Sequence, residues 1–180
     1  MRIIGGSHKG RRFSFPASLP VRPTTDFAKE SLFNILNNTI DFDGIHVLDL
    51  FSGSGNLSYE LSSRNAHSIL SIEQNPKCCA FIRKTTKEYE FPISVRQIDA
   101  FRFLNQKAMK SFDLILADPP YALKEIERLP QLILENGWLK PDGIFVLEHG
   151  SEHTFKSHPN MHDERIYGHV HFSFFGNESK

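Results

Sequence analysis

The sequence predicts an α/β protein built on a doubly wound, mostly parallel sheet, and three observations support this prediction. The chain has 180 residues, enough for one domain with a sizeable core. From residue 45 onward, short apolar runs alternate with segments whose apolar residues recur at helical spacing. A glycine-rich loop follows the first of these runs. Strands and helices in strict alternation imply parallel strands with helices on both faces of the sheet.

Two elements are expected before the alternation begins. Residues 2–5 and 12–15 are short apolar stretches on either side of the turn-rich segment 6–10, a pattern that predicts a β-hairpin. Prolines then keep the chain extended as far as Thr24-Thr25-Asp26, which offers a helix cap with an acidic first turn. The apolar residues that follow predict a helix over 26–37.

The remaining elements follow in order along the chain. The predicted strands of the alternating region are 46–51, 68–73, 93–98, 112–117 and 144–148. The helices predicted between them are 56–64, 75–88, 101–107 and 123–135. Residues 164–167 and 170–175, joined around Gly168, predict an antiparallel hairpin at an edge of the sheet. We expect a single domain over residues 1–180, with an N-terminal extension over 1–40 and a core over 41–180.

Composition and the start of the chain exclude several classes of protein. With 39% hydrophobic and 23% charged residues, the chain is neither disordered nor fibrous. No apolar run approaches the roughly 18 residues of a membrane span, and the first residues lack the apolar stretch of a secretory signal. We therefore expect a cytoplasmic protein with no membrane partner. Cys78 and Cys79 are adjacent and are expected to be reduced thiols.

The charges cancel over the whole chain but are unevenly distributed. The sequence has 21 lysines and arginines and 21 aspartates and glutamates. Residues 1–29 hold six basic residues and one acidic residue, which leaves this segment at +5 and the rest of the chain at −5. A basic segment on an acidic body favours local contact with phosphate groups. The alternative is a solvated basic tail.

The loop Ser52-Gly53-Ser54-Gly55, after the first strand of the alternating region, predicts a ligand site. Glycines let the backbone approach a ligand closely, and open α/β sheets bind ligands at the carboxyl ends of their strands. The third glycine of the dinucleotide fingerprint is missing and Ser58 follows instead, which counts against a pyrophosphate. Asp49, at the end of the strand, would repel a diphosphate and favour a cationic or amine-bearing ligand.

Two further strand ends carry acidic residues that suit a nucleoside. Glu73 follows Gly53 by 20 residues, about the spacing at which a carboxylate meets ribose hydroxyls. Asp99 and Ala100, after the third strand, are placed to meet an adenine amino group. S-adenosylmethionine fits this set because it has a ribose, an ammonium group and a sulfonium but no phosphate. The alternative for each carboxylate alone is a solvated loop residue or a helix cap. The candidate cofactor-binding residues are Asp49, Phe51, Gly53, Gly55, Glu73, Asp99 and Ala100.

The tetrapeptide Asp118-Pro119-Pro120-Tyr121 follows the fourth strand and predicts chemistry on an amino group. The prolines fix the backbone and remove its donors, so the carbonyls of Asp118 and Pro119 can face a bound group. The Asp118 carboxylate and a carbonyl would accept both hydrogens of an exocyclic amine, and Tyr121 would stack on its ring. Holding both hydrogens favours a pyramidal nitrogen whose lone pair points at the methyl group of the sulfonium. The proton is then lost to Asp118 or to water. The alternative is a turn in which the prolines merely end the strand.

Six histidines occur near the end of the chain, and in two pairs of them three residues separate one histidine from the other. They are His149, His153, His158, His162, His169 and His171. No cysteine accompanies them, and the segment is predicted to be loop and hairpin instead of one long helix. We therefore expect no metal site.

Several motifs together resemble one known family over nearly the whole chain. They are residues 1–6, the turn 9–11, residues 22–26 and 30–36, the loop 49–55, Asp118 to Tyr121, and residues 165–168. On these motifs the chain resembles the bacterial 16S rRNA guanine-N2 methyltransferases of the RsmD type. The resemblance implies a Rossmann-like class I fold and methyl transfer from S-adenosylmethionine to a guanine amine of 16S rRNA. The implied substrate is a small ribosomal subunit or an assembly intermediate, and we expect a monomer with no obligate protein partner.

The resemblance also implies roles for residues and leaves other functions open. The residues expected to grip RNA phosphates are Arg2, Lys9, Arg11, Arg12 and Arg22, while a splayed-out base is read in the pocket. The departures from the family pattern are Phe27-Ala28-Lys29, Asn56, Ser58 and Tyr59. The alternatives are methylation of adenine or cytosine in DNA, methylation of protein glutamine, and a non-catalytic RNA-binding assembly factor. The DNA enzymes normally need a recognition domain for which 180 residues leave no room.

Overall fold

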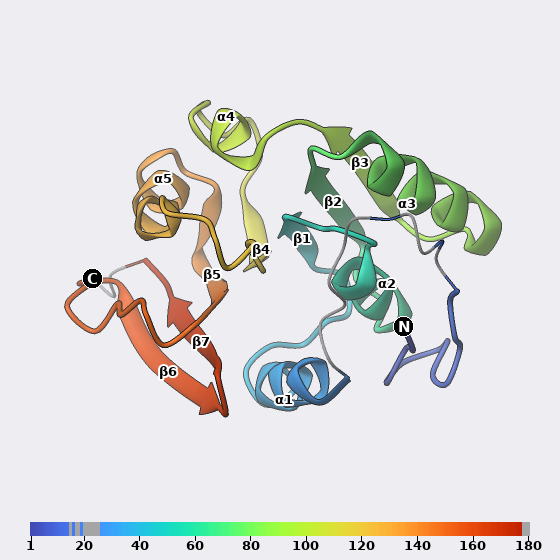
Figure 1. Cartoon of the computed structure of the whole chain (residues 1–180), viewed down its shortest axis with the longest axis horizontal. Helices are drawn as coiled ribbons and strands as arrows, with labels where there is room; N and C mark the ends of the chain where they lie inside the picture. The colour runs from blue at the N-terminus through green and yellow to red at the C-terminus, as the bar shows by residue number, and fades with distance from the viewer. Residues whose placement is uncertain (15, 17–18, 20–25, 178–180) are drawn as a thin grey trace.

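A seven-stranded sheet of order β3-β2-β1-β4-β5-β7-β6 runs through the molecule (Figure 1). The computed structural model describes residues 1–14, 16, 19 and 26–177. The strands are β1 (His46–Leu50), β2 (Ser68–Glu73), β3 (Ile93–Gln97), β4 (Phe112–Ala117), β5 (Leu139–His149), β6 (Met161–Tyr167) and β7 (Val170–Phe175). Strands β1 to β5 pair in parallel, whereas β7 is antiparallel to both β5 and β6. The predicted fold class is therefore confirmed, including the antiparallel C-terminal hairpin.

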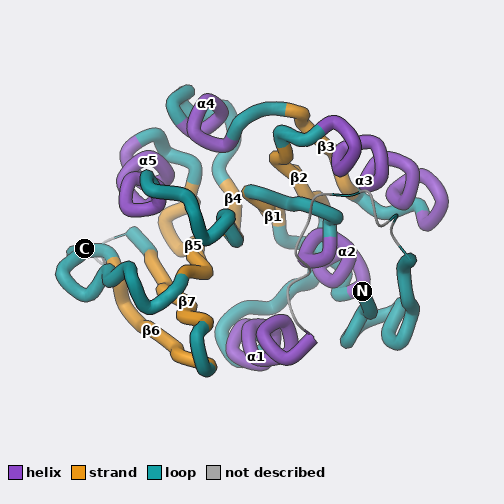
Figure 2. The backbone as a smooth tube through the Cα atoms, viewed as in Figure 1, coloured by secondary structure: helices purple, strands orange, loops and turns teal. Residues whose placement is uncertain are grey.

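The helices divide between the two faces of the sheet (Figure 2). They are α1 (Asp26–Leu36), α2 (Asn56–Ser63), α3 (Pro76–Tyr89), α4 (Ala100–Leu104), the 3₁₀ helix η1 (Ile126–Arg128) and α5 (Leu129–Glu135). Side chains alternate along each strand, so Val47 of β1 packs with α1, α2 and α3, and its neighbour Leu48 packs with α4 and α5. None of the helices in the described part of the chain has both the length and the apolarity to cross a membrane.

Four predicted boundaries differ from the structure by three residues or more: β5 and β6 begin earlier than predicted, α4 ends earlier, and the helical segment η1-α5 begins later. Strand β5 begins at Leu139, five residues before the predicted strand, since Leu139 pairs with Phe112 ahead of a register irregularity. The sequence Pro141-Asp142-Gly143 looks like a turn but continues the strand. The predicted helix 123–135 begins only at Ile126 and is 3₁₀ in its first turn.

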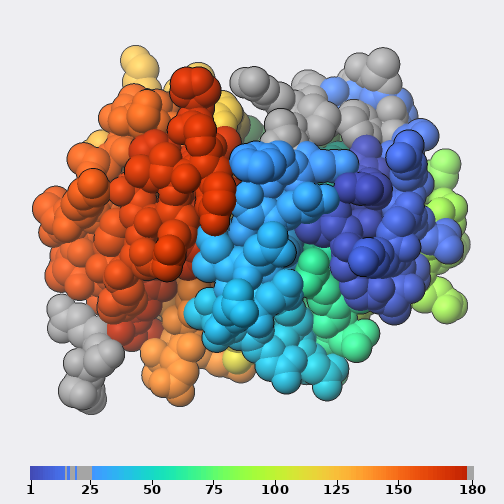
Figure 3. All heavy atoms as spheres, turned by 90° about the horizontal axis from the view of Figure 1, so that it is seen from below, coloured from blue at the N-terminus to red at the C-terminus, as the bar shows by residue number. Residues whose placement is uncertain are grey.

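The N-terminal segment forms the predicted hairpin, held by a short antiparallel bridge between Arg2 and Arg12. The backbone N–H of Ile3 donates to the carbonyl of Arg11 at 2.9 Å. Ile3 and Phe13 are buried in the core that α1, α2 and α3 cover, and the ring of Phe13 lies 5.1 Å from that of Tyr59. On the face drawn in Figure 3, α1 lies between this hairpin and the C-terminal strands.

A buried lysine ties the hairpin to the two nearest helices. The ammonium group of Lys29 in α1 is fully buried; it donates to the carbonyl of Arg2 and, at 2.9 Å, to Asn56 Oδ1 at the start of α2. It lies 3.6 Å from Glu60 Oε2, which also accepts the backbone N–H of Ile4 at 2.8 Å. Burial lowers the pKa of Lys29, and Glu60 opposes this shift. Lys29 and Asn56, two departures from the family pattern, are therefore partners in one contact.

Candidate active site

The loop between β1 and α2 lies where the strand order reverses, because β1 is flanked by β2 on one side and β4 on the other. Such a switch point opens a crevice at the carboxyl ends of the strands. Three loop residues, Phe51, Gly53 and Gly55, have φ values of 58°, 53° and 84°. A Cβ atom at Gly55 would stand 2.8 Å from the ring of Tyr59. The turn into α2 therefore requires glycine at position 55.

Asp49 lies behind this loop and is fully buried. It accepts a hydrogen bond from the hydroxyl of Ser58 in α2, and Ser58 Oγ lies 2.8 Å from Ser71 Oγ on β2. Burial raises the pKa of Asp49 to about 7, and repulsion from Asp118 and Glu73 acts in the same direction. A cation bound at the crevice would favour the charged form of this carboxyl group. Ser58, another departure from the family pattern, supplies the hydroxyl that holds it.

The carboxylate of Glu73 holds the glycine loop in place. Its Oε2 accepts the N–H of Gly53 at 2.8 Å, and its Oε1 accepts the N–H of Asn75 at 2.7 Å. Each carboxylate oxygen has a second lone pair, so Glu73 can still accept ribose hydroxyls. The structure thus brings Glu73 and Gly53 into direct contact.

Asp99 and Ala100 stand at the next strand end. Asp99 is exposed and caps α4, since its Oδ1 accepts the N–H of Arg102 at 2.8 Å. Ala100 is buried in the first turn of that helix. Phe51 faces the same helix, with its ring 6.4 Å from that of Phe101. The cap uses one oxygen of Asp99, and the other oxygen can accept from an adenine amino group.

Asp118 continues β4 and meets a residue that the sequence reasoning missed, Glu148 near the end of β5. A cavity of about 10 Å³ is lined by both carboxyl groups and by Pro119, Pro120 and Tyr121. Glu148 is buried, and burial together with repulsion from Asp118 raises its pKa. The signal for Glu148 was its position at a strand end, like that of Glu73. That signal was hidden because only the sheet order shows that β4 and β5 are neighbours.

The cavity and Tyr121 set where a flat ring can lie. A space of about 10 Å³ is no larger than one water molecule requires, so a purine ring cannot enter it. Tyr121 is 49% exposed and is among the residues that line the cavity. An amine could reach Asp118 while its ring stacks on Tyr121. A separate open hollow of about 700 Å³ lies around residues 37–43 and 63–65, and none of the predicted site residues line it.

Strand alternation places four carboxyl groups on the side of the sheet that α2 covers. They are Asp49, Glu73, Asp118 and Glu148. The charges of Glu73 and Asp118 repel that of Asp49, and Asp118 repels Glu148. Carboxyl groups gathered in this way bind a positively charged ligand more readily than an anionic one. The ammonium and sulfonium groups of S-adenosylmethionine match this donor set, and a diphosphate does not.

The predicted RNA-binding residues are not all alike in the structure. Lys9, Arg11 and Arg12 are exposed on the hairpin, where the guanidinium of Arg11 lies 4.7 Å from the centre of the Tyr89 ring. Arg2 is instead paired with two acidic residues of α1, Glu30 at 3.0 Å and Asp26 at 3.6 Å. Arg22 lies outside the described residues. Among the predicted RNA-binding residues that the structure describes, the exposed ones are therefore Lys9, Arg11 and Arg12.

Comparison with known proteins shows that the chain matches one protein family over most of its length. The family model described as conserved hypothetical protein 95 matches residues 1–176. The ribosomal RNA small subunit methyltransferase D of Escherichia coli (strain K12) is 31% identical over 184 residues, covering 100% of this chain and 91% of the relative. The Bacillus subtilis protein named "Putative rRNA methyltransferase YlbH" is 38% identical over 156 residues, 84% of each chain.

A solved structure agrees with these relatives in sequence and in fold. The structure titled "Putative methyltransferase yhhF from Escherichia coli" superposes with a TM-score of 0.85 at 30% identity, covering 100% of this chain and 99% of that one. The match extends from the N-terminal hairpin through the glycine loop to the C-terminal strands. The chain therefore belongs to the conserved hypothetical protein 95 family, the family of the ribosomal RNA small subunit methyltransferases D.

Proposed function

We propose that this protein methylates the exocyclic N2 amine of one guanine in 16S rRNA, with S-adenosylmethionine as the methyl donor. S-adenosylmethionine-dependent methylation of small-subunit rRNA is the activity of the family. The choice of a guanine amine rests on one observation: Asp118-Pro119-Pro120-Tyr121 ends β4 beside the glycine loop of β1, with the carboxyl group of Glu148 next to Asp118. This arrangement suits an amine on a flat ring.

The crevice between β1 and β4 would hold the cofactor. Glu73 accepts hydrogen bonds from the ribose hydroxyls, the loop Gly53 to Gly55 allows close approach of the backbone, and Asp99 with Ala100 holds the adenine. Asp49 supplies negative charge behind the loop. When bound, S-adenosylmethionine supplies a methyl group on a positively charged sulfur.

The target amine would be held by the residues after β4. The carboxylate of Asp118 and a backbone carbonyl of the Asp118-Pro119 segment accept its two hydrogens, which directs the nitrogen lone pair away from the ring plane. Burial and repulsion from Asp118 raise the pKa of Glu148, which favours the protonated form of Glu148 beside Asp118. The carboxylate of Asp118 can then take the proton that the amine loses, or pass it to water.

Basic side chains would bind phosphates of the rRNA at a distance from the target base. Lys9, Arg11 and Arg12 reach phosphates, and Arg2 and Arg22 complete the set, while the base is splayed out onto Tyr121. We also propose that the protein acts as a monomer, in the cytoplasm, on a small subunit or an assembly intermediate.

The test is methyl transfer from labelled S-adenosylmethionine to small ribosomal subunits from a strain that lacks the modification. We expect transfer to a single guanine, located by mass spectrometric mapping. Asp118→Ala should lower turnover by about 10²–10⁴-fold with cofactor affinity unchanged. Asp142→Ala, at an exposed position of β5 outside the site, is the matched control and should keep full turnover. Transfer to duplex DNA or to a glutamine peptide, with none to subunits, would refute the assignment.

A further inference from the structure

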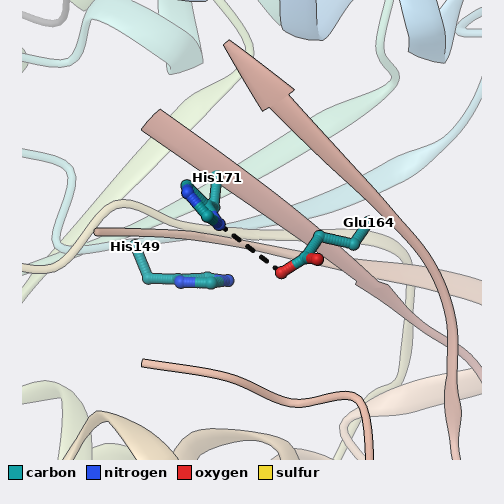
Figure 4. Close-up of side chains that lie close together, drawn as sticks. All are labelled: His149, Glu164 and His171. Carbon is teal, nitrogen blue, oxygen red and sulfur yellow. Dashed lines mark ion pairs between the residues drawn. The ribbon is translucent and has the colours of Figure 1, made fainter. Parts of the chain in front are cut away.

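Strand pairing brings together histidines that the sequence keeps apart. His149 at the end of β5 is the register partner of His171 on β7, and Glu164 on β6 is the partner of Ser173, two residues along β7 from His171. Residues two apart on a strand point to the same face. All of these side chains therefore lie on one face of the sheet, as Figure 4 shows for His149, Glu164 and His171. This is the face that α4 and α5 cover, opposite the face of Glu148.

The spacing in this cluster is that of metal ligands. One ligand atom from each of the three side chains lies within 4.8 Å of the others. His171 Nδ1 is 3.5 Å from Glu164 Oε1, and within the described part of the chain this buried nitrogen has no hydrogen-bond partner. Two ligands that share a tetrahedral ion at 2.0–2.1 Å stand about 3.4 Å apart. A buried ring nitrogen aimed at a carboxylate without a hydrogen bond is thus in the position of a ligand.

The tautomer of His149 also suits a metal. Its Nδ1 lies 2.8 Å from the carbonyl oxygen of Gly150, which can only accept, so Nδ1 carries the proton. The lone pair is then on Nε2, which lies 2.8 Å from Ser173 Oγ. A metal-binding histidine commonly has its second nitrogen bonded to a backbone carbonyl in this way.

The cluster is largely buried, and its surroundings balance the charge of a divalent ion only in part. The ring of Phe155, in the loop between β5 and β6, lies 5.0 Å from that of His149 and covers it. Glu164 supplies one negative charge, and Lys156 Nζ lies 3.6 Å from its other oxygen on the outer side. Two imidazoles and one carboxylate form a set that suits zinc, whereas magnesium and calcium prefer oxygen ligands alone.

We propose that His149, Glu164 and His171 bind one zinc ion, with a water molecule or Ser173 Oγ as the fourth ligand. The ion joins β5, β6 and β7 and thereby fixes the C-terminal hairpin on the parallel sheet. It also anchors the end of β5, where Glu148 faces Asp118. The prediction of no metal site considered spacing along the chain, whereas the ligands meet through strand register.

The test is zinc binding to the full chain after dialysis against a chelator. We expect one equivalent of Zn²⁺ by calorimetry, a higher Tm with zinc, and a tetrahedral visible spectrum when Co²⁺ replaces it. His171→Gln and Glu164→Gln should each weaken binding by about 100-fold or more and abolish the Tm shift. The matched control His169→Gln, at the exposed turn of the same hairpin, should bind as the parent does.

A second variant distinguishes a zinc site from a cluster held only by hydrogen bonds. It does so even if His171→Gln and Glu164→Gln fold poorly. Ser173→Ala removes the hydroxyl that occupies His149 Nε2 and leaves all three proposed ligands. We expect it to retain one equivalent of zinc, with affinity within about 10-fold of the parent. Absence of zinc binding to the parent chain, or equal binding by His171→Gln and the parent, would overturn the proposal.

Discussion

At the scale of single residues, the buried carboxyl group of Asp49 favours a positively charged ligand at the site. Its carboxyl group is buried, yet its partner Ser58 is a neutral hydroxyl. A buried carboxylate without a cation is costly, which is why the pKa is raised to about 7. The same property that makes Asp49 unfavourable in the free protein makes it suited to a cationic cofactor.

The raised pKa of Asp49 predicts how the free energy of unfolding depends on pH. The folded protein holds the Asp49 proton up to about pH 7, whereas the unfolded chain releases it near the ordinary value of 3.8. The folded state therefore binds more protons between these values, and the free energy of unfolding falls as pH rises through that window. We expect urea denaturation to show lower stability at pH 8 than at pH 5, by on the order of a few kcal/mol.

The variant Asp49→Asn checks that this residue is the cause. It should reduce the difference between pH 5 and pH 8 without abolishing it, because burial and repulsion from Asp118 raise the pKa of Glu148 to about 8, and Glu148 lowers stability in the same direction over this window. Asp43→Asn, at an exposed position before β1, should leave the slope as it is in the parent. A parent protein as stable at pH 8 as at pH 5 would contradict the interpretation.

At the scale of elements, the N-terminal hairpin is a small platform that presents positive charge. Its inner residues, Ile3 and Phe13, are buried against α1, α2 and α3, while Lys9, Arg11 and Arg12 face outward. The apolar contacts fix the hairpin, so its charges are held on a defined surface instead of on a tail.

The hairpin predicts a measurable dependence of RNA binding on salt. Reversing Arg11 and Arg12 to Glu should weaken binding to small subunits by at least about 10-fold and flatten the dependence of affinity on salt, because fewer counterions are released. Filter binding over a salt series measures both. The matched control reverses Lys107 and Lys110, exposed before β4, and should bind as the parent does. Unchanged affinity in the Arg11 and Arg12 variant would mean that the hairpin is only a solubilising segment.

At the scale of the whole molecule, the buried Lys29 makes the extension part of one structure. It joins the backbone of Arg2, the start of α2 at Asn56 and the carboxylate of Glu60. Without the ammonium, Asn56 Oδ1 would lose a buried donor, whereas Glu60 would keep the N–H of Ile4 and the guanidinium of Arg64. We propose that residues 1–40 and 41–180 form a single domain that unfolds as one unit.

The variant Lys29→Met tests whether residues 1–40 and 41–180 unfold together. It should lower the free energy of unfolding by about 3 kcal/mol while keeping a single transition. Trp138, the only tryptophan, is buried on the opposite face of the sheet, so its fluorescence reports the far side of the molecule. We expect fluorescence and far-UV circular dichroism to shift together, and exposed Lys84→Met to shift neither. A fluorescence midpoint that stays at the parent value would show that the extension unfolds separately.

From the sequence by itself, the helices and strands could be predicted, and so could the place of the candidate site at the carboxyl ends of the strands. Periodicity identified every strand, and the motifs at residues 49–55 and 118–121 lie at the strand ends where they were expected. These features are local, because helical spacing, strand alternation and turn residues are properties of neighbouring positions. The tertiary structure alone decided the rest. It paired Glu148 with Asp118, Lys29 with Asn56, and His149 with His171. The two residues of each pair come from different elements, and strand order, strand register and helix packing bring them together.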